Sequence, residues 1–323
     1  MKGQMNPYTF AAVTGQEKAK KILARVSESG RLAHAYLFRG PDGVGKRLCA
    51  GVFAAGINCR TPSSEGGCGH CPSCLKYVSG NHPDIVLVAP EKGTIRIDRI
   101  RALCQSLAYP PYESETRVVI IEDVHTMRGE AANSLLKTLE EPPPGNLLIL
   151  TSESNREVLA TIVSRCQIVP FFGLRVRQTI DVIRANDPGI GETEAEMLGR
   201  LTEGSPGKAL LLKEKKLVRV WESVIAAVEQ PVKEASAEVL LAEAEKIAAL
   251  KEDIVHLLGL LRIWVRDRML RDAGSGDIDQ PLERFRLKAI DQAERELARN
   301  CNRTLVSEVL LFNLQSPRPR LFF

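Results

Sequence analysis

The sequence has 323 residues, of which 44% are apolar and 26% charged, a composition typical of a globular protein of two or three domains. The formal net charge of +4 permits contact with nucleic acid but is too small to require it. The most apolar run is too short to span a bilayer and we see no apolar signal segment, so we expect a cytoplasmic protein without membrane contact. Eight cysteines in such a chain indicate reduced thiols or metal ligation rather than disulfides.

Short apolar segments alternate with helical patterns in the first half of the chain. Helices are expected over Asp98–Leu107, with Asp98 as the N-cap, and over Glu130–Glu141. This alternation predicts an α/β fold with a mostly parallel sheet that is covered on both faces. The expected strands are Ala35–Phe38, Ile85–Val88, Val118–Ile121, Leu147–Leu150 and Ile168–Phe171.

A glycine-rich loop, GPDGVGKR, follows the first expected strand and precedes a helical pattern that starts at Lys46. It is one residue away from the P-loop pattern G-x-x-x-x-G-K-[ST], with Gly40, Gly45 and Lys46 in place. The amides of Gly43 to Lys46 would then lie at a helix N-terminus, where phosphate binds readily. A strand-to-helix turn without a ligand is the alternative interpretation.

Arg47 stands where the P-loop pattern has a Ser or Thr hydroxyl that ligates Mg²⁺. A guanidinium has only donors and stays cationic, so it cannot coordinate a metal. ATP or ADP binding is compatible with this loop, whereas Mg²⁺ binding is in doubt. Hydrolysis is expected to suffer more than binding, because the metal offsets charge that develops as the phosphates separate.

A cysteine cluster follows in NCRTPSSEGGCGHCPSC, with the spacing C-x8-C-x2-C-x2-C over Cys59, Cys68, Cys71 and Cys74. Four thiolates at short spacing in a Gly-, Ser- and Pro-rich segment are typical of a structural, tetrahedral Zn²⁺ site. A closed set of four thiolates leaves no open coordination position, so we expect a role in folding rather than catalysis. Ligation by His70 in place of one cysteine stays open, as does a set of four unconnected thiols.

A buried strand that ends in two acids, Glu122 and Asp123, comes next in RVVIIEDVHTM. In P-loop proteins the usual order is an acid that binds Mg²⁺ followed by a Glu that orients the attacking water. Here the long and short side chains are exchanged, and catalysis is sensitive to displacements of about 1 Å. The two acids form a degenerate catalytic pair, or they only solvate the end of a strand.

Strand signals fade after Phe172, and the rest of the sequence is helical in pattern. We therefore divide the chain into a core over residues 1–172, a small helical domain over 173–212 and a larger helical domain over 213–323.

Several motifs occur in an order that resembles the delta-prime subunits of bacterial DNA polymerase III clamp loaders, a family of the AAA+ superfamily. They are the P-loop, the segment with four cysteines after its helix, HPDIVLV from His82, ANSLLKTLEEPPPG from Ala132 and TIVSRCQIV from Thr161. The resemblance covers at least Phe10 to Phe172, and the helical remainder fits loosely. It implies an AAA+ parallel-sheet core with a zinc-binding insertion, a small helical lid domain and an all-α collar domain. The apolar stretch Ile254–Val265 of that collar would pack against sister subunits or, alternatively, form the core of the domain.

The resemblance also implies a function. Clamp loaders are pentamers that use ATP to open a ring-shaped sliding clamp and place it on primer-template DNA. The gamma or tau subunits hydrolyse ATP, whereas delta-prime subunits commonly have a defective nucleotide site and act as a rigid stator beside gamma, tau and delta. Because Arg47 disfavours hydrolysis, it favours the delta-prime interpretation, with an ATPase activity of its own that is weak or absent.

The resemblance assigns roles to further residues. Arg165, in SRC, is the candidate arginine finger, acting in trans on ATP held by a neighbouring subunit. Thr151 or Ser152 falls at the sensor-1 position, and Lys208, in GSPGKAL, at the sensor-2 position. Each also has an ordinary interpretation, as a surface arginine, a strand-end cap or a solvated charge at a helix start.

Two other functions stay open at this point. The chain could be a catalytically active motor, either gamma- or tau-like or another AAA+ DNA-handling ATPase, for which a Ser or Thr at position 47 would be typical. It could also be a zinc-dependent adaptor that binds no nucleotide. Nothing in the sequence indicates base-specific contact with DNA, so any contact would be with phosphates.

Overall fold

The computed structural model describes residues 8–153, 158–230, 237–275 and 280–315. The chain divides into two compact units, Met1–Lys208 and Ala209–Phe323, and the division falls inside helix α9 (Pro206–Glu214). No helix in the described part of the chain is long and apolar enough to cross a membrane.

The first unit contains a five-stranded sheet with the strand order β2-β3-β4-β1-β5, and each neighbouring pair is parallel. Its strands are β1 (Ala35–Arg39), β2 (Ile85–Val88), β3 (Arg117–Ile121), β4 (Asn146–Ser152) and β5 (Gln167–Pro170). Its helices are η1 (Phe10–Ala12), α1 (Glu17–Ser29), α2 (Lys46–Ile57), α3 (Pro72–Val78), α4 (Ile97–Leu107), η2 (Val124–Thr126), α5 (Gly129–Glu140), α6 (Ala160–Val163), α7 (Val176–Asn186) and α8 (Glu192–Leu201). The expected α/β class with a parallel sheet is confirmed.

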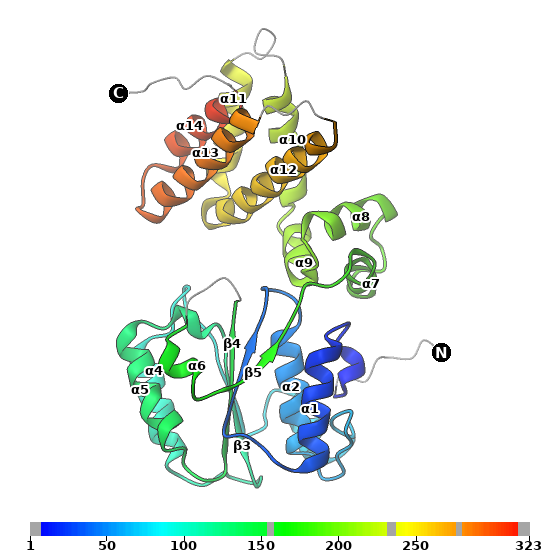
Figure 1. The fold of residues 1–323 in the computed structure, drawn as a ribbon, viewed down its shortest axis with the longest axis vertical. Coiled ribbons are helices and arrows are strands. Elements are labelled where there is room, and N and C mark those ends of the chain that lie inside the picture. The colour runs from blue at the N-terminus through cyan, green and yellow to red at the C-terminus, as the bar shows by residue number, and fades with distance from the viewer. Residues whose placement is uncertain (1–7, 154–157, 231–236, 276–279, 316–323) are drawn as a thin grey trace. The chain divides into compact units, whose positions relative to one another are not determined.

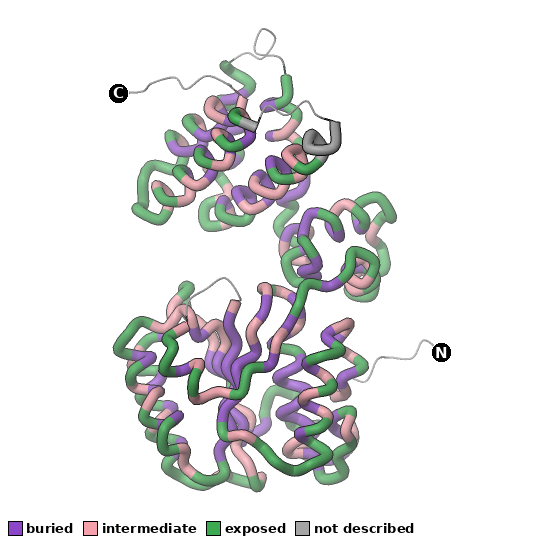
Figure 2. Tube along the Cα trace, viewed as in Figure 1, coloured by how far each residue is buried: buried purple, intermediate pink, exposed green. Residues whose placement is uncertain are grey.

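Helices cover both faces of this sheet, with α1 and α2 on one side and α4 and α5 on the other (Figure 1). The central strands are buried along their length, as expected for a parallel sheet between two helical layers (Figure 2). Side chains alternate between the two cores. Tyr36 and Phe38 of β1 face α2, whereas Leu37 faces α4 and α5.

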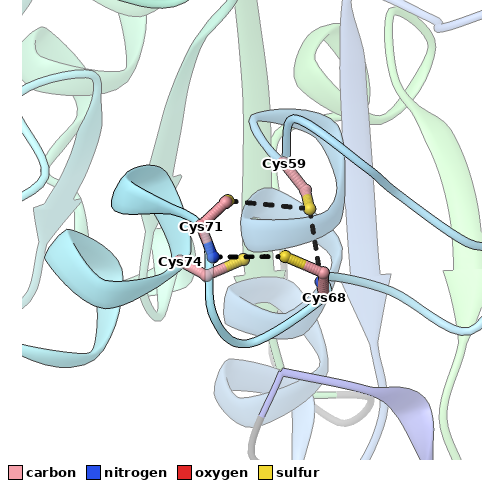
Figure 3. A group of neighbouring side chains, drawn as sticks. All are labelled: Cys59, Cys68, Cys71 and Cys74. Carbon is pink, nitrogen blue, oxygen red and sulfur yellow. Dashed lines mark hydrogen bonds between the residues drawn. The ribbon is translucent and has the colours of Figure 1, made fainter.

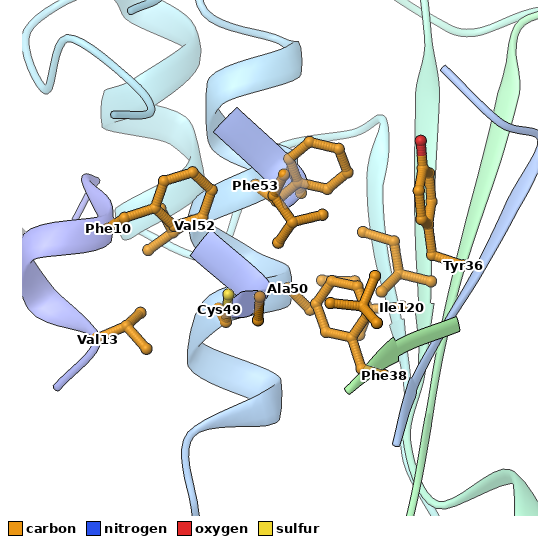
Figure 4. Close-up of a cluster of buried hydrophobic side chains, with 14 of the residues drawn as sticks. Phe10, Val13, Tyr36, Phe38, Cys49, Ala50, Val52, Phe53 and Ile120 are labelled. Atoms are coloured by element: carbon orange, nitrogen blue, oxygen red, sulfur yellow. The ribbon is translucent and has the colours of Figure 1, made fainter. Parts of the chain in front are cut away.

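The core beneath α2 is rich in aromatic side chains (Figure 4). The rings of Tyr36 and Phe53 meet edge to face with centroids 5.6 Å apart, and Phe38 lies against Phe171 at 5.2 Å. Such pairs stabilise a core beyond the area that they bury. The first pair fixes α2 against β1, and the second joins β1 to the segment that follows β5.

The parallel arrangement of β3, β4 and β1 brings the carboxyl ends of these strands to one edge of the sheet. The P-loop leaves β1 there, Glu122 and Asp123 follow β3, and Thr151 and Ser152 end β4. Residues far apart in the sequence are thereby gathered into one site.

The boundaries of some elements differ from the expected ones. Asp98 is not an N-cap, because α4 begins at Ile97 with Arg96 in the extended cap position. Asp98 instead lies in the first turn, where a carboxylate is favoured by the helix dipole, 3.5 Å from the Arg96 guanidinium. The last strand begins and ends one residue earlier than expected, and β4 continues through Thr151 and Ser152.

The second unit is all-helical, after the shared helix α9. It contains α10 (Leu217–Glu229), α11 (Ala237–Ala249), η3 (Lys251–Asp253), α12 (Ile254–Ser275), α13 (Gln280–Ala298) and α14 (Arg303–Gln315). Leu257, Leu261 and Val265 of α12 are buried in the core of this unit. Most of the apolar stretch Ile254–Val265 is therefore monomer core, although Val255 is 50% exposed.

A buried carboxylate at the start of β2 holds the segment that leads into β3. Asp84 is fully buried and accepts hydrogen bonds from the backbone N–H groups of Tyr112, Glu113 and Ser114, at 2.6, 2.8 and 2.9 Å. Burial alone would raise the pKa of Asp84, but these three bonds and the charge of Arg117 outweigh it, so its pKa is lowered. The charged form of Asp84 therefore stabilises the folded state above the unfolded pKa, and this contribution is lost as the pH falls through the folded pKa.

We expect Asp84→Asn to lower the free energy of unfolding at neutral pH by about 1.5–3 kcal/mol, because a neutral amide is a weaker acceptor for three N–H donors. Thermal unfolding of the two proteins measures it. Asp98→Asn, at a side chain that is 72% exposed, is the matched control and should change little. A deficit that fails to shrink as the pH falls below about 4 would contradict the electrostatic account.

Candidate functional site

The P-loop joins β1 to α2 and needs glycine at three positions. Gly43 and Gly45 have φ of +69° and +97°, in the left-handed region that other residues avoid. A Cβ on Gly40 would lie 2.4 Å from the backbone oxygen of Phe171. Any residue with a side chain at one of these three positions would therefore strain the loop or clash with its neighbours.

The loop presents donors and positive charge to one cavity. The first amides of α2 have no acceptor within the helix, and the positive end of the helix dipole lies there. Lys46 is 6% exposed, and its Nζ donates to the backbone oxygens of Gly40 and Pro41 at 3.0 and 2.7 Å. Burial lowers the pKa of Lys46, and the nearby carboxylates of Asp42 and Asp123 oppose that shift. Such a loop can hold phosphate groups.

The cavity in front of the loop has a volume of about 480 Å³. It is lined by Asp42, Gly43, Gly45, Lys46, Arg47, Leu48, Tyr77, Glu122, Asp123 and Thr151. Most expected loop residues and both acids are therefore brought together. Apart from the four cysteines, the expected site residues that do not line this cavity are Gly40, Ser152, Arg165 and Lys208.

Arg47 contacts the first acid of the strand end. Its Nε lies 2.9 Å from Oε1 of Glu122, whose side chain is only 13% exposed. Burial raises the pKa of Glu122, the Arg47 charge opposes this, and Asp123 adds to it. The residue that provides a hydroxyl in a P-loop is replaced here by Arg47, a cation that forms an ion pair with Glu122.

The second acid is held in a constrained position. Asp123 has a φ of +47°, which is unusual for a residue other than glycine, and its N–H donates to Oγ1 of Thr151 at 3.0 Å. Burial raises the pKa of Asp123, and the charge of His125 opposes this. Thr151 lines the cavity, whereas Oγ of Ser152 lies 3.4 Å from Nδ1 of His125. Of the two candidates for the sensor-1 position, only Thr151 lines the cavity, whereas Ser152 contacts the loop through its backbone oxygen, which accepts from the N–H of Gly40 at 3.2 Å.

The loop is also held by residues that sequence reasoning missed. Oγ of Ser205 donates to the backbone oxygen of Asp42 at 2.7 Å, and the N–H of Gly207 donates to that of Gly43 at 2.9 Å. A Cβ on Gly207 would lie 2.7 Å from Cα of Gly43, so the two backbones meet where only glycine fits. Lys208, next in sequence, is exposed, and its charge helps to lower the pKa of Lys46.

Gln16 is a second missed residue. It is 8% exposed, and its amide bonds with the backbone of Val44 and of Phe172. In the sequence Gln16 lies in TGQEK, a short polar segment before the first helix. That position does not indicate a contact with residues as distant in the sequence as Phe172.

Arg165 follows the short helix α6 and is 34% exposed. Its guanidinium lies 2.7 Å from a carboxylate oxygen of Glu140 and donates to the backbone oxygen of Thr161 at 2.9 Å. These partners orient the side chain while leaving part of the guanidinium accessible.

The four cysteines converge as the spacing predicts (Figure 3). Their sulfur atoms all lie within 4.8 Å of one another, and those of Cys59 and Cys71 are 3.9 Å apart. A tetrahedral Zn²⁺ site with Zn–S bonds of about 2.3 Å requires sulfur separations of about 3.8 Å. The backbone N–H groups of Cys68 and Cys71 donate to Sγ of Cys59 and Cys68. The four cysteines can therefore hold a metal ion, and a tetrahedral metal such as zinc fits their donor set.

His70 lies outside this group of sulfur ligands. Its Nδ1 is 3.1 Å from the backbone oxygen of Cys68, and the metal-binding group found among the described residues consists of cysteines alone. The module is tied to the N-terminal segment, since the N–H of Gly67 donates to the backbone oxygen of Tyr8. This arrangement fits a metal that organises the fold.

Comparison with known proteins gives consistent relatives. Residues 15–174 match the family described as "DNA polymerase III, delta subunit". The DNA polymerase III subunit delta' of Bacillus subtilis is 36% identical over 190 residues, which are 58% of this chain and 57% of that protein. The subunit tau of Escherichia coli is 34% identical over 210 residues, which are 64% of this chain and 32% of that protein. The chain thus spans between a third and about half of the length of these relatives.

A solved structure shares the fold. The gamma subunit-related protein of Thermotoga maritima superposes with a TM-score of 0.51 at 20% identity, covering 93% of this chain and all of that one. The chain therefore shares the fold of that protein, and the expected parallel-sheet core, cluster of four cysteines that can hold a metal and helical C-terminal region are confirmed. The family match covers residues 15–174, and the resemblance to delta-prime subunits of DNA polymerase III is confirmed over these residues.

The protein is expected to bind one Zn²⁺ per chain, because the four thiolates close a tetrahedral shell. Metal analysis of protein purified without chelator measures it. Cys71→Ser should lower the zinc content from about one to near zero and lower the unfolding temperature, since metal binding contributes to folding. Cys301→Ser, at an exposed cysteine outside the cluster, should change neither. Zinc-free wild-type protein, or unchanged stability of Cys71→Ser, would contradict the assignment.

Proposed function

We propose that this chain is a delta-prime-like clamp-loader subunit that acts as a stator. In this role it assembles with gamma or tau and delta subunits and helps them to load a sliding clamp onto primer-template DNA. The ATP that drives loading is held and hydrolysed by its neighbours. The observation that carries the proposal is the contact of Arg47 with Glu122 in an otherwise retained P-loop.

The P-loop keeps the residues that bind phosphate but not the hydroxyl that catalysis requires. The glycines and Lys46 that shape a phosphate cradle are retained, while the hydroxyl that would ligate Mg²⁺ is replaced by a cation. Hydrolysis depends on a metal and on an oriented water, so this exchange removes catalysis first. A stator needs the folded loop but does not need to hydrolyse ATP there.

The contacts of the loop with Ser205 and Gly207 support a rigid role. They join the P-loop to the first turn of α9 and to the residue before it, so the small helical domain proposed over residues 173–212 would be held against the core. A subunit that does not turn over ATP has no need to open this contact. The helical residues 213–323 would then serve as the collar that binds sister subunits.

Arg165 would act on a neighbour's ATP. Its guanidinium is part exposed and keeps only one carboxylate partner among the described residues, Glu140. A terminal phosphate carries more negative charge than a single carboxylate and accepts a planar, bidentate donor well. We therefore infer that Arg165 exchanges Glu140 for the phosphate when a gamma or tau subunit docks.

An active gamma- or tau-like ATPase is the second candidate. It is favoured by the retained Lys46, Glu122 and Asp123 and by the similar identity to the tau relative. It requires the acids to bind Mg²⁺ although Arg47 lies against one of them. Turnover by the isolated chain separates the two candidates.

The isolated chain is expected to hydrolyse ATP more slowly than about 1 s⁻¹, the lower end for phosphoryl-transfer enzymes. The reason is the missing hydroxyl together with the exchanged lengths of Glu122 and Asp123. Steady-state phosphate release measures it. Arg47→Thr restores only the hydroxyl and so need not restore turnover. Faster turnover by the wild-type chain would favour the motor interpretation.

Arg165→Ala is expected to lower ATP hydrolysis and clamp loading by a complex reconstituted with gamma or tau, delta, clamp and primed DNA. An arginine finger contributes roughly 10³–10⁵ in rate in other nucleotide hydrolases, and the loss here should be smaller because only one of several sites lacks it. Arg165→Lys should be nearly as harmful, because an ammonium lacks the planar fork.

Arg200→Ala is the matched control, at a 75% exposed arginine with only a 3.9 Å contact to Glu196. It should load clamps at the wild-type rate. If the complex with Arg165→Ala assembles and also loads at the wild-type rate, Arg165 is a surface charge and its proposed role in trans is wrong.

A further inference from the structure

Arg47 occupies the sequence position whose hydroxyl ligates a divalent cation in P-loop proteins. It is the second residue of α2, and its Nε lies 2.9 Å from Oε1 of Glu122. Oε1 accepts no hydrogen bond within the described residues, so the contact is ionic. The first acid of the strand end is thus neutralised by a charge that belongs to the chain.

Mg²⁺ does not fit this arrangement. It requires oxygen ligands in a near-octahedral shell at about 2.0–2.1 Å, and a guanidinium offers no lone pair. Arg47 provides no ligand, and its positive charge lies against the carboxylate that would provide one. The residues present therefore disagree with the metal that the fold implies.

The remaining parts of the cradle do fit phosphate. The positive φ of Gly43 and Gly45 and the first amides of α2 direct N–H donors toward the cavity. Arg47 lines the same cavity, and its side chain is 67% exposed. Its ion pair with Glu122 is made through Nε, which leaves the Nη end of the guanidinium for a further acceptor. Lys46, Arg47 and the loop amides can all donate to one anion.

We propose that Arg47 takes the place of the divalent cation, so that this site binds the phosphates of a nucleotide without Mg²⁺. The inference rests on the proposed function, in which the P-loop still binds a nucleotide, and it concerns which groups balance the negative charge of the phosphates. Arg47 would pair with both Glu122 and the terminal phosphate, and its charge would offset part of the negative charge that the metal offsets in a hydrolysing subunit. The chain would thereby bind a nucleotide while lacking the metal needed to cleave it.

The charge balance predicts which nucleotide is preferred. Arg47 carries one positive charge where Mg²⁺ would carry two, and Glu122 and Asp123 both remain in the site. The site therefore compensates less phosphate charge than a metal-containing one, which favours a nucleoside diphosphate over a triphosphate. Added Mg²⁺ binds the free nucleotide but would gain no ligand from Arg47. It should therefore leave the affinity of the site for ADP unchanged or lower it.

The test is equilibrium binding of ADP and ATP to the full-length chain by calorimetry, in EDTA and in Mg²⁺. Wild-type protein is expected to bind ADP in EDTA at least as tightly as in Mg²⁺, and more tightly than ATP. Arg47→Thr should bind ADP in EDTA roughly tenfold or more weakly, the value of one charge-assisted hydrogen bond, and should gain affinity when Mg²⁺ is added. Arg99→Thr, at an exposed arginine on α4, should behave as wild type.

Zinc content and thermal unfolding establish that each variant is folded. Wild-type binding that requires Mg²⁺, equal binding of Arg47→Thr in EDTA, or no ADP binding in either condition would each overturn the inference. None of these outcomes bears on clamp loading, which the reconstituted complex tests separately. Loss of loading with metal-independent ADP binding intact would instead reject the proposed function alone.

Discussion

The parallel order of β3, β4 and β1 is the constraint on which the site depends. It brings three strand ends to one edge of the sheet, so a glycine loop, an acid pair and a buried threonine meet although more than a hundred residues separate the first from the last. Two aromatic contacts, Tyr36 with Phe53 and Phe38 with Phe171, fix the helix and strand that carry the loop. The chemistry of the site then depends on which side chains this edge carries.

One of those side chains changes what the edge can do. Arg47 replaces a neutral metal ligand by a cation and lies against Glu122, so the acids keep a counter-charge without a metal. The loop itself is preserved for a second reason. Gly43 packs against Gly207 and the Asp42 carbonyl accepts from Ser205, so the loop belongs to the packing of the unit whether or not a nucleotide is bound. The glycines therefore have a structural reason to be retained even where Arg47 replaces the metal-binding hydroxyl.

Local patterns were enough to predict the α/β class, the strands and the convergence of the four cysteines, because each depends on short-range periodicity or spacing. Contacts between distant segments were not predictable in this way. The pairs Arg47 with Glu122 and Arg165 with Glu140 need the strand order, and the contacts of Gln16, Ser205 and Gly207 need the path of the backbone. The error at Asp98 has a local cause, since an acid is favoured both at an N-cap and in the first turn that follows it.

We propose that this protein serves clamp loading through Arg165 and not through hydrolysis of a nucleotide in its own site. The most direct test of this proposal compares the clamp-loading rates of complexes reconstituted with Lys46→Ala or with Arg165→Ala, after both have been shown to assemble. The account predicts near wild-type loading with Lys46→Ala, which removes the phosphate-binding lysine, and reduced loading with Arg165→Ala. Loading that is lost with Lys46→Ala and retained with Arg165→Ala would contradict it.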